Sequence, residues 1–362
     1  MAPLEEFAEL EAIPPLKCPP RLLTPLKIAI YTSVFSPSVG GQETLAAILA
    51  SEFQRVGHNV TVLCETPIAN TNRRVGDVRV LRHPLFVQRL LTAWGADVAM
   101  VFGATIIGLL PFVLARKKVL VSHQNWLTTA DGPVRGWTRK QLLRRVKNCA
   151  ASEALSVTIP AECEVLPNTY DHSIFTRDAN TSAHRDIIFV GRLIREKGCD
   201  DLINALSLVI KSGRILTASI VGSGPQEKHL RTMVSDLGLE DYVDFLGPLL
   251  GAELAKAYQK HTILVVPSVW EEPFGIVALE GIACGCYVIG TAVGGLPAAI
   301  GPCGSVVSPG NPQELATKLI QVSRDGQLRR DAGVSAGVHL AHHSPREIAG
   351  RYLRILAQLV AC

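Results

Sequence analysis

The stretch Ser268-Val-Trp-Glu-Glu-Pro-Phe-Gly-Ile-Val-Ala-Leu-Glu280 decides how the second half of this chain is interpreted. Proline suits the first position of a helix, where its missing N–H would have no partner anyway, so a helix is predicted to begin at about Pro273. The unpaired backbone N–H groups of its first turn would lie at the positive end of the helix dipole and form a seat for phosphate. These are the amides of Phe274, Gly275, Ile276 and Val277. Gly275 would let a ligand approach the backbone closely.

Two carboxylates flank this seat. Glu272 precedes the predicted helix, and Glu280 lies about two turns beyond its start. A nucleotide-diphosphate-sugar, which has hydroxyl groups on both sides of a diphosphate, suits such a layout. In the plainer interpretation, Glu271 and Glu272 only complement the helix dipole and Glu280 faces solvent.

Composition limits the class of protein. The chain has 362 residues, of which 48% are hydrophobic, and a formal net charge of +4. This length allows about two domains with substantial cores, and the mild charge without a long basic run does not indicate nucleic acid binding. Nine scattered cysteines do not form a disulfide framework and favour a reducing compartment, so a cytoplasmic location is expected. Residues 1–26 are rich in acids and prolines and are predicted to be a loosely ordered leader.

Short apolar runs alternate with helical periodicity along the rest of the chain. Strands are predicted at 27–32, 59–64, 78–81, 97–102, 118–122, 186–191, 217–221, 243–246, 262–266 and 286–289, with helices between most of them. This alternation predicts an α/β fold with parallel sheets and right-handed crossovers. Because loop-forming residues cluster at 166–185, we expect two Rossmann-like domains, 27–168 and 169–344, facing a cleft.

The apolar segment Val98 to Ala115 resembles a membrane span in hydropathy, yet Gly103, Gly108 and Pro111 interrupt it. We therefore expect a buried strand that turns into a buried helix. The segment Arg135 to Lys147 combines the apolar residues Trp137, Leu142, Leu143 and Val146 with six cations. It is predicted either to be a solvated helix that docks its leucine face on the sheet or to rest on an anionic membrane.

Three turns after predicted strands are candidates for anion contact. The loop from Phe35 to Gly41, which ends in Gly40 and Gly41, precedes a helix, although an ordinary strand-to-helix turn explains it equally well. The segment Gly191 to Gly198 places Arg192 and Lys197 in one loop, where they could clamp a diphosphate or simply be solvated. Gly222 and Gly224 end the next strand beside the same cleft.

These segments, taken together, resemble a known family. The motifs are Gly40-Gly41, Val190-Gly-Arg192 with Lys197-Gly198, Val221-Gly-Ser-Gly224, Phe245-Leu-Gly247, Pro267-Ser268 with Glu272-Pro-Phe-Gly275 and Glu280, and Gly294-Gly295-Leu-Pro297. They look like those of the retaining glycosyltransferases of the GT-B fold, family 4 type, whose Glu-x7-Glu pair would correspond to Glu272 and Glu280. The resemblance extends from Lys27 to the C-terminus and is most specific in the second half.

The resemblance implies a role for several residues. Glu272 would contact the donor sugar, Glu280 would hold the ribose, and Arg192 and Lys197 would clamp the diphosphate with the amides near Gly275. His123, at the end of a strand, matches a histidine that such enzymes place near the donor sugar, although a lone histidine is also explained as a satisfied polar residue. The family works without a metal or other cofactor. Its C-terminal helix, here residues 345–362, crosses back onto the first domain.

One departure from the family pattern, and two residue groups that could suggest a metal site, complete the comparison. Pro167-Asn-Thr-Tyr-Asp171 has Thr169 where the family usually has glycine, which puts the hinge geometry in doubt. Neither the cysteines at 284, 286 and 303 nor the histidines at 339, 342 and 343 have a familiar metal-ligand spacing, so no metal site is expected.

The sequence therefore predicts a metal-independent, retaining transferase that moves a sugar from a nucleotide donor to an unidentified acceptor, either lipid-linked or a glycan. A nucleotide-sugar epimerase of the same fold and a non-catalytic sugar-nucleotide-binding protein are the alternatives.

Overall fold

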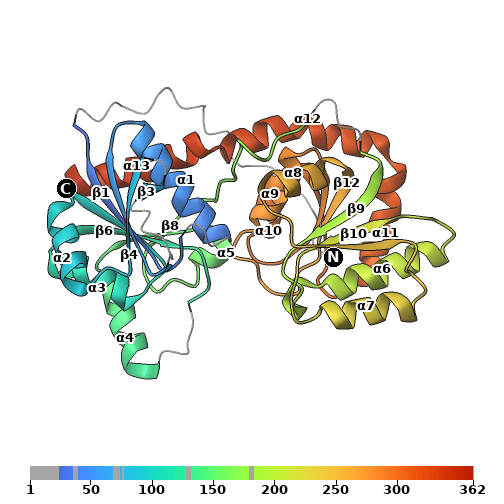
Figure 1. The fold of residues 1–362 in the computed structure, drawn as a ribbon, viewed down its shortest axis with the longest axis horizontal. Coiled ribbons are helices and arrows are strands. Elements are labelled where there is room, and N and C mark those ends of the chain that lie inside the picture. Colours follow the sequence, from blue (N-terminus) through green and yellow to red (C-terminus); the bar gives the residue numbers. More distant parts are fainter. Residues whose placement is uncertain are drawn as a thin grey trace.

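The computed structural model describes residues 24–35, 40–67, 74–75, 77–127, 132–178 and 183–361. Most of the predicted leader and residues 36–39 of the first glycine loop lie outside the described residues. Two α/β units stand side by side, and the long C-terminal helix runs from the second unit back along the first (Figure 1). The predicted α/β fold with two Rossmann-like units is confirmed.

The first unit is built on a sheet of the order β3-β4-β2-β1-β5-β6-β7-β8, parallel except for the β3–β4 pair. Its elements are β1 (Lys27–Thr32), α1 (Gly41–Arg55), β2 (Asn59–Cys64), β3 (Arg74–Val75), β4 (Val78–Arg82), α2 (Phe86–Gly95), β5 (Val98–Phe102), α3 (Ile106–Leu114), β6 (Lys118–His123), α4 (Gly132–Leu143), β7 (Lys147–Ala150), α5 (Glu153–Ser156) and β8 (Cys163–Val165). The five strands predicted in this half are confirmed. Strands β3, β7 and β8 are short and are not among the predicted strands.

The second unit has a fully parallel sheet of the order β11-β10-β9-β12-β13-β14. Its elements are β9 (Arg185–Val190), η1 (Arg195–Lys197), α6 (Cys199–Lys211), β10 (Ala218–Val221), α7 (Glu227–Asp236), β11 (Val243–Gly247), α8 (Gly251–Gln259), β12 (His261–Val266), α9 (Ile276–Ala283), β13 (Tyr287–Thr291), α10 (Leu296–Ile300), η2 (Gly301–Cys303), β14 (Gly304–Val307), α11 (Pro312–Arg324) and α12 (Gly326–His342). Nearly continuous apolar strands of this kind are typical of sheets covered on both faces.

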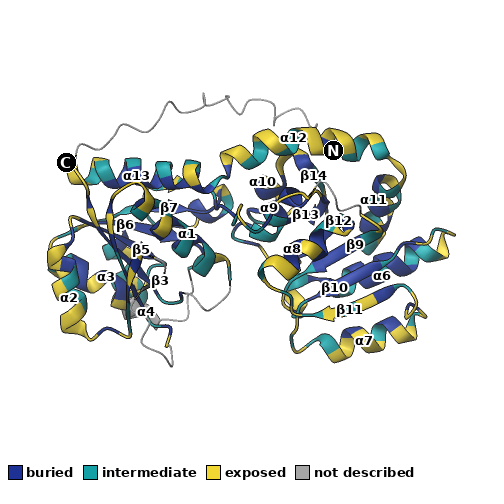
Figure 2. Cartoon of the chain, turned by 45° about the horizontal axis from the view of Figure 1, so that its top comes forward, coloured by how far each residue is buried: buried dark blue, intermediate teal, exposed yellow. Residues whose placement is uncertain are grey.

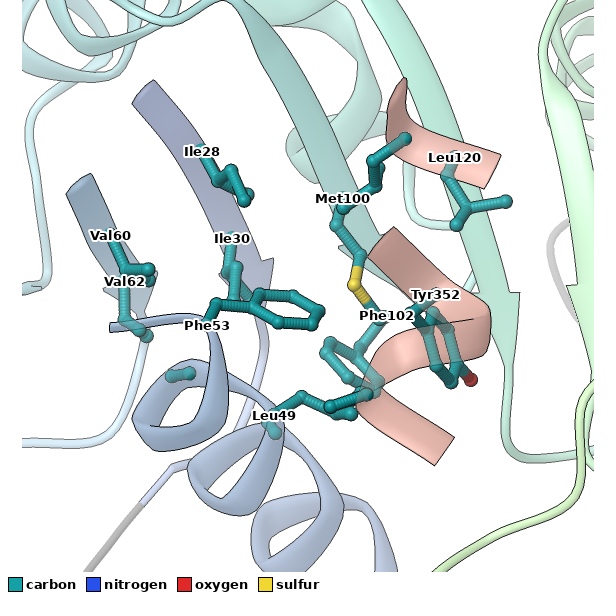
Figure 3. Close-up of a cluster of buried hydrophobic side chains, with 14 of the residues drawn as sticks. Ile28, Ile30, Leu49, Phe53, Val60, Val62, Met100, Phe102, Leu120 and Tyr352 are labelled. Atoms are coloured by element: carbon teal, nitrogen blue, oxygen red, sulfur yellow. The ribbon is translucent and has the colours of Figure 1, made fainter. Parts of the chain in front are cut away.

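The C-terminal helix α13 (Pro345–Ala361) belongs to the core of the first unit. Its buried Tyr352 lies among side chains of β1, β5 and α1 (Figure 3). The Tyr352 hydroxyl also shares a hydrogen bond of 2.8 Å with Ser122 Oγ at the end of β6. The predicted return of this helix to the first domain is therefore confirmed.

Two chain crossings connect the units, at 167–171 and at 343–345. The His343 ring nitrogen Nδ1 lies 2.9 Å from the backbone oxygen of Asn168, so the two crossings are tied to each other. Among the described non-glycine residues, positive φ angles occur at His83 and Arg116. Thr169 thus adopts an ordinary backbone conformation in place of the family's glycine.

One expectation about burial is wrong. The segment after β5 forms helix α3, but only its inner side is buried, while Ile107, Leu110 and Leu114 are exposed. A run of apolar residues does not reveal which side of a helix is covered, because that depends on the neighbouring elements. No helix in the described part of the chain is both long and apolar enough to cross a bilayer.

Candidate functional site

In the second unit, the loops that carry the predicted site residues leave the carboxyl ends of three neighbouring strands, β10, β9 and β12. In open parallel sheets, ligands bind at this edge. The parallel order therefore brings together segments that are far apart along the chain.

The helix whose first turn would form the predicted phosphate seat begins later than expected. Helix α9 starts at Ile276, not at Pro273, because Gly275 adopts φ 104° and caps the helix. A Cβ at Gly275 would lie 2.7 Å from Leu296 Cδ1, so glycine is needed there for both conformation and space. The Ala278 amide donates to the Gly275 backbone oxygen at 3.0 Å, and the preceding amides of Ile276 and Val277 have no hydrogen-bond partner among the described residues.

An ion pair lies immediately before this helix. Lys197 Nζ lies 2.5 Å from Glu272 Oε1, and Ser268 Oγ donates to the same carboxylate oxygen at 2.7 Å. Two hydrogen bonds to backbone oxygens hold the main chain around this pair. The Gly295 amide donates to the Glu272 backbone oxygen at 2.7 Å, and the Thr291 hydroxyl donates to the Ser268 backbone oxygen at 2.6 Å. Glu272 is buried, whereas Lys197 keeps part of its surface.

Local backbone geometry brings Lys197 to this position. Lys197 ends the short helix η1, and Gly198 follows in the left-handed region with φ 65°. A Cβ on Gly198 would lie 2.0 Å from the Pro267 oxygen, so only glycine allows the two loops to pack this closely. The loop after β9 and the loop after β12 therefore meet at Lys197 and Glu272.

The other loop residues fall into two groups. Gly222 and Gly224 pack on the backbone of the β9 loop: a Cβ on Gly222 would lie 1.9 Å from the Gly191 oxygen, with φ 138°. Both glycines therefore shape the loop rather than offering an open surface at their Cα atoms. The Arg192 guanidinium, by contrast, is exposed.

Glu280 lies on α9, where its Oε2 accepts a hydrogen bond of 3.3 Å from the Tyr258 hydroxyl. The pKa of Glu280 is raised to about 7, chiefly because burial disfavours its charged form; the hydrogen bond from Tyr258 acts against this rise and the nearby Asp171 carboxylate adds to it. Pro273 and Phe274 lie in the segment between the two glutamates. The Phe274 ring packs against the His343 ring, with 5.6 Å between the ring centroids.

His123 ends β6 in the first unit and is buried. Its Nε2 lies 3.2 Å from Asn148 Oδ1, and its Nδ1 is buried with no hydrogen-bond partner among the described residues. Burial lowers the pKa of His123 to about 4, with Asn148 acting against the shift and Arg139 adding to it. The ring is therefore neutral near pH 7, and one of its nitrogens lacks a hydrogen-bond partner among the described residues.

The two units touch at the start of α9. The Trp126 indole N–H donates to the Glu271 oxygen at 2.7 Å, directly beside Glu272. A Cβ on Gly41 would lie 3.1 Å from Ile276 Cδ1, so α1, with Gly40 as its N-cap, begins against the first turn of α9. The described residues thus bring Gly41 of the first unit to the phosphate seat and Trp126 to the Glu272 loop.

Sequence reasoning missed three contact residues: Trp126, Ser268 and Tyr258. Ser268 belongs to the Pro267-Ser268 motif, to which the sequence assigns no contact, and Trp126 lies three positions after His123. No local sequence pattern indicates a role for Tyr258. A cavity of about 280 Å³ opens elsewhere, between η1 and α7, and shares none of the predicted site residues; its lining is Ile194, Arg195, Cys199, Asp200, Gln226, His229 and Leu230.

Two Rossmann-like units, a C-terminal helix that returns to the first unit, and a candidate site at their junction define the GT-B architecture. Solved structures share it. The chain superposes on the Anabaena protein HepE, crystallised in complex with UDP, with a TM-score of 0.78 at 20% identity, covering 92% of this chain and 100% of that one. The sucrose-phosphate synthase of Thermosynechococcus elongatus gives 0.74 at 22% identity, covering 93% and 99%.

A family model matches a part of the chain that lies mostly in the second unit. Residues 174–336 match the family model described as glycosyl transferases group 1. A D-inositol 3-phosphate glycosyltransferase of Paenarthrobacter aurescens is 36% identical over 159 residues, which is 42% of this chain and 39% of that protein. An uncharacterised glycosyltransferase of Methanocaldococcus jannaschii is 39% identical over 145 residues, or 40% and 37% of the two chains. The chain thus spans less than half the length of the curated relatives that it matches.

Proposed function

We propose that this protein transfers a sugar from a nucleotide-diphosphate-sugar donor to an acceptor, with retention of the anomeric configuration and without a metal ion. The observation that carries the proposal is the junction of Lys197 and Glu272 with the first turn of α9. A cation, a carboxylate and free backbone amides meet there, as a donor with a diphosphate and a sugar requires. Anabaena HepE, which shares the fold, was also crystallised with UDP-glucose.

Each group has a place in the proposed reaction. The diphosphate would lie against the amides of Ile276 and Val277, with Lys197 and Arg192 balancing its charge. Glu280, at the far end of the seat, would accept hydrogen bonds from the ribose hydroxyls. Glu272 would bind hydroxyls of the donor sugar.

The bond between the anomeric carbon and the phosphate oxygen breaks while the acceptor oxygen bonds to the same face of that carbon. The acceptor proton goes to the leaving phosphate, so no protein base is required. The protein contributes chiefly by stabilising the charge that develops on the leaving diphosphate. His123, neutral and with a free Nδ1, would hydrogen-bond the donor sugar from the first unit.

Turnover with a panel of UDP-, GDP- and ADP-sugars, with and without candidate acceptors, tests the proposal. Release of free nucleotide only when acceptor is present supports transfer, and the anomeric proton coupling of the product tests retention. An isomerised donor would instead indicate an epimerase, and tight binding without turnover a sugar-nucleotide-binding protein. Activity that survives extensive chelation would support the metal-independent mechanism. We also propose that the reaction takes place in the cytoplasm.

A further inference from the structure

Large apolar side chains are exposed together on the outer surface of α2 and α3. Leu91 and Trp94 of α2 are each 58% exposed, and Ile107 of α3 is 63% exposed. The remaining members of this surface are Leu85, Phe86, Val87, Leu110 and Leu114. We call these eight residues the α2–α3 apolar face. Contiguous exposed apolar surface of this kind usually marks an interaction site.

The face is continuous because the two helices form one layer. Helices α2 and α3 pack against each other, and their inner residues Ala93, Leu109 and Phe112 belong to one buried cluster on the sheet. Leu143 of α4 joins the same cluster, so α4 lies in this layer too. Figure 1 shows the three helices on the same side of the first unit, and Figure 2 shows the exposed outer surface of α2.

Within each helix the exposed residues follow one stripe. Val87, Leu91 and Trp94 recur at i, i+4 and i+7, and Ile107, Leu110 and Leu114 recur at i, i+3 and i+7. Side chains at this spacing share one side of a helix. Both helices are therefore apolar on the inner and the outer side, as is expected when the outer side also contacts an apolar medium.

The same part of the chain is strongly basic. Residues 83–152 hold ten lysines and arginines but only two acids, Asp97 and Asp131, whereas the whole chain carries a net charge of +4. Arg116 and Lys118 are exposed directly after α3, and Lys140 is exposed on α4 beside the exposed Trp137. Two more exposed cations, Arg144 and Arg145, follow α4.

We propose that the α2–α3 apolar face and the cations of α4 rest on a bilayer with anionic headgroups. Apolar side chains would enter the boundary between headgroups and acyl chains, and the surrounding cations would contact the headgroups. A second copy of the chain fits less well, because a two-fold contact would set this basic surface against itself. The structure thus moves the centre of the predicted membrane contact from residues 135–147 to α2 and α3.

Helix α4, which carries some of these cations, follows His123 of the candidate site along the chain, and the charge of its Arg139 acts on the His123 ring. If the proposed transfer also holds, the acceptor would be a saccharide or carrier anchored in the lipid that α4 contacts. This statement about the acceptor rests on the proposed function, whereas the membrane contact itself does not. Binding to vesicles needs neither donor nor turnover, so it is tested separately from the proposed function.

Flotation of the full chain with vesicles provides the test. Vesicles of phosphatidylcholine alone are compared with vesicles containing roughly 30% phosphatidylglycerol. The variant Leu91→Glu/Trp94→Glu alters two exposed side chains, and Val334→Glu/Val338→Glu on α12 is its matched control, because those valines are also exposed. Arg116→Ser/Lys118→Ser tests the charge, with Lys211→Ser/Lys228→Ser as control. Circular dichroism and thermal unfolding establish that each variant folds.

The chain is expected to float with the anionic vesicles and to be released as the salt is raised from about 0.1 M to about 0.5 M. Leu91→Glu/Trp94→Glu should weaken partitioning by roughly thirtyfold or more, since two half-exposed apolar side chains no longer enter the lipid. Both control variants should float like the unaltered chain. Absence of flotation, or equal loss in the Val334→Glu/Val338→Glu control, would overturn the proposal. So would a dimer in sedimentation equilibrium that Leu91→Glu/Trp94→Glu dissociates, because the face would then join two copies.

Discussion

Replacement of Glu272 by glutamine separates sugar contact from diphosphate contact. Glu272→Gln keeps the size of the side chain but removes the charge that Lys197 faces at 2.5 Å. In the proposed arrangement, Lys197 then offers its full charge to the diphosphate, while the sugar loses its carboxylate partner. Binding of a free nucleoside diphosphate should therefore be retained or become tighter, and sugar transfer should fall sharply.

The magnitude follows from the Lys197–Glu272 contact. A hydrogen bond between charged groups contributes about 1.5 to 3 kcal/mol, but solvent reaches Lys197 and screens the pair. We expect a gain of about 1 kcal/mol in diphosphate binding, or about fivefold in Kd. Loss of a contact that strengthens in the transition state should lower kcat by about a hundredfold or more.

Calorimetric titration with UDP and GDP, together with transfer assays, measures both effects. Glu271→Gln is the matched control, because Glu271 is the exposed neighbour and, among the described residues, its contact is the hydrogen bond that its backbone oxygen accepts from Trp126. It should change neither quantity appreciably. If Glu272→Gln weakened diphosphate binding as much as it weakened transfer, Glu272 would be a support for the phosphate seat and our reasoning would be refuted.

The remaining predictions concern Lys197, Gly222 and the partly buried Glu280. Lys197→Ala should weaken nucleoside diphosphate binding by about tenfold in calorimetry, since one charged contact is lost, while the exposed Arg195→Ala serves as a control that should not. Gly222→Ala should lower the free energy of unfolding by about 2 kcal/mol or more in urea titration, because its Cβ would strike the Gly191 oxygen; a change within about 0.5 kcal/mol would contradict the close packing. Because the pKa of Glu280 is raised in the folded state to about 7, the folded protein retains a proton that the unfolded chain releases, and stability should fall as pH rises from about 4.5 to 7. Glu280→Gln should remove on the order of 2 to 3 kcal/mol of that fall, and an unchanged pH profile would show that the acid is not perturbed.

Much of the fold was predictable because its signals are local. The ten predicted strands all occur, with ends that differ by at most a few residues, since each is a short apolar run between turn-forming residues. The start of α9 was not predictable from Pro273. Gly275 takes its positive φ beside Leu296, some twenty residues further along the chain, whose Cδ1 would lie 2.7 Å from an added Cβ.

The candidate site was predicted as a set of residues but not as a set of contacts. The sequence placed Lys197 and Glu272 in separate motifs with separate partners, whereas the structure pairs them across 75 positions. The Trp126 contact with Glu271 spans 145 positions and joins two different units. No periodicity or spacing encodes such a pair, because it depends on how the β9, β12 and β6 loops are placed by their sheets.

By itself, the sequence determined the alternation of strands and helices, the two-unit α/β plan and the glycine and charge motifs of the second unit. These follow from backbone preferences and from side-chain patterns within about twenty residues. Only the tertiary structure decided which charges meet, where α9 begins, and that α2 and α3 keep an apolar surface uncovered. Each of these depends on which segments become neighbours when parallel strands align, and burial and contact are properties of neighbours rather than of the residues alone.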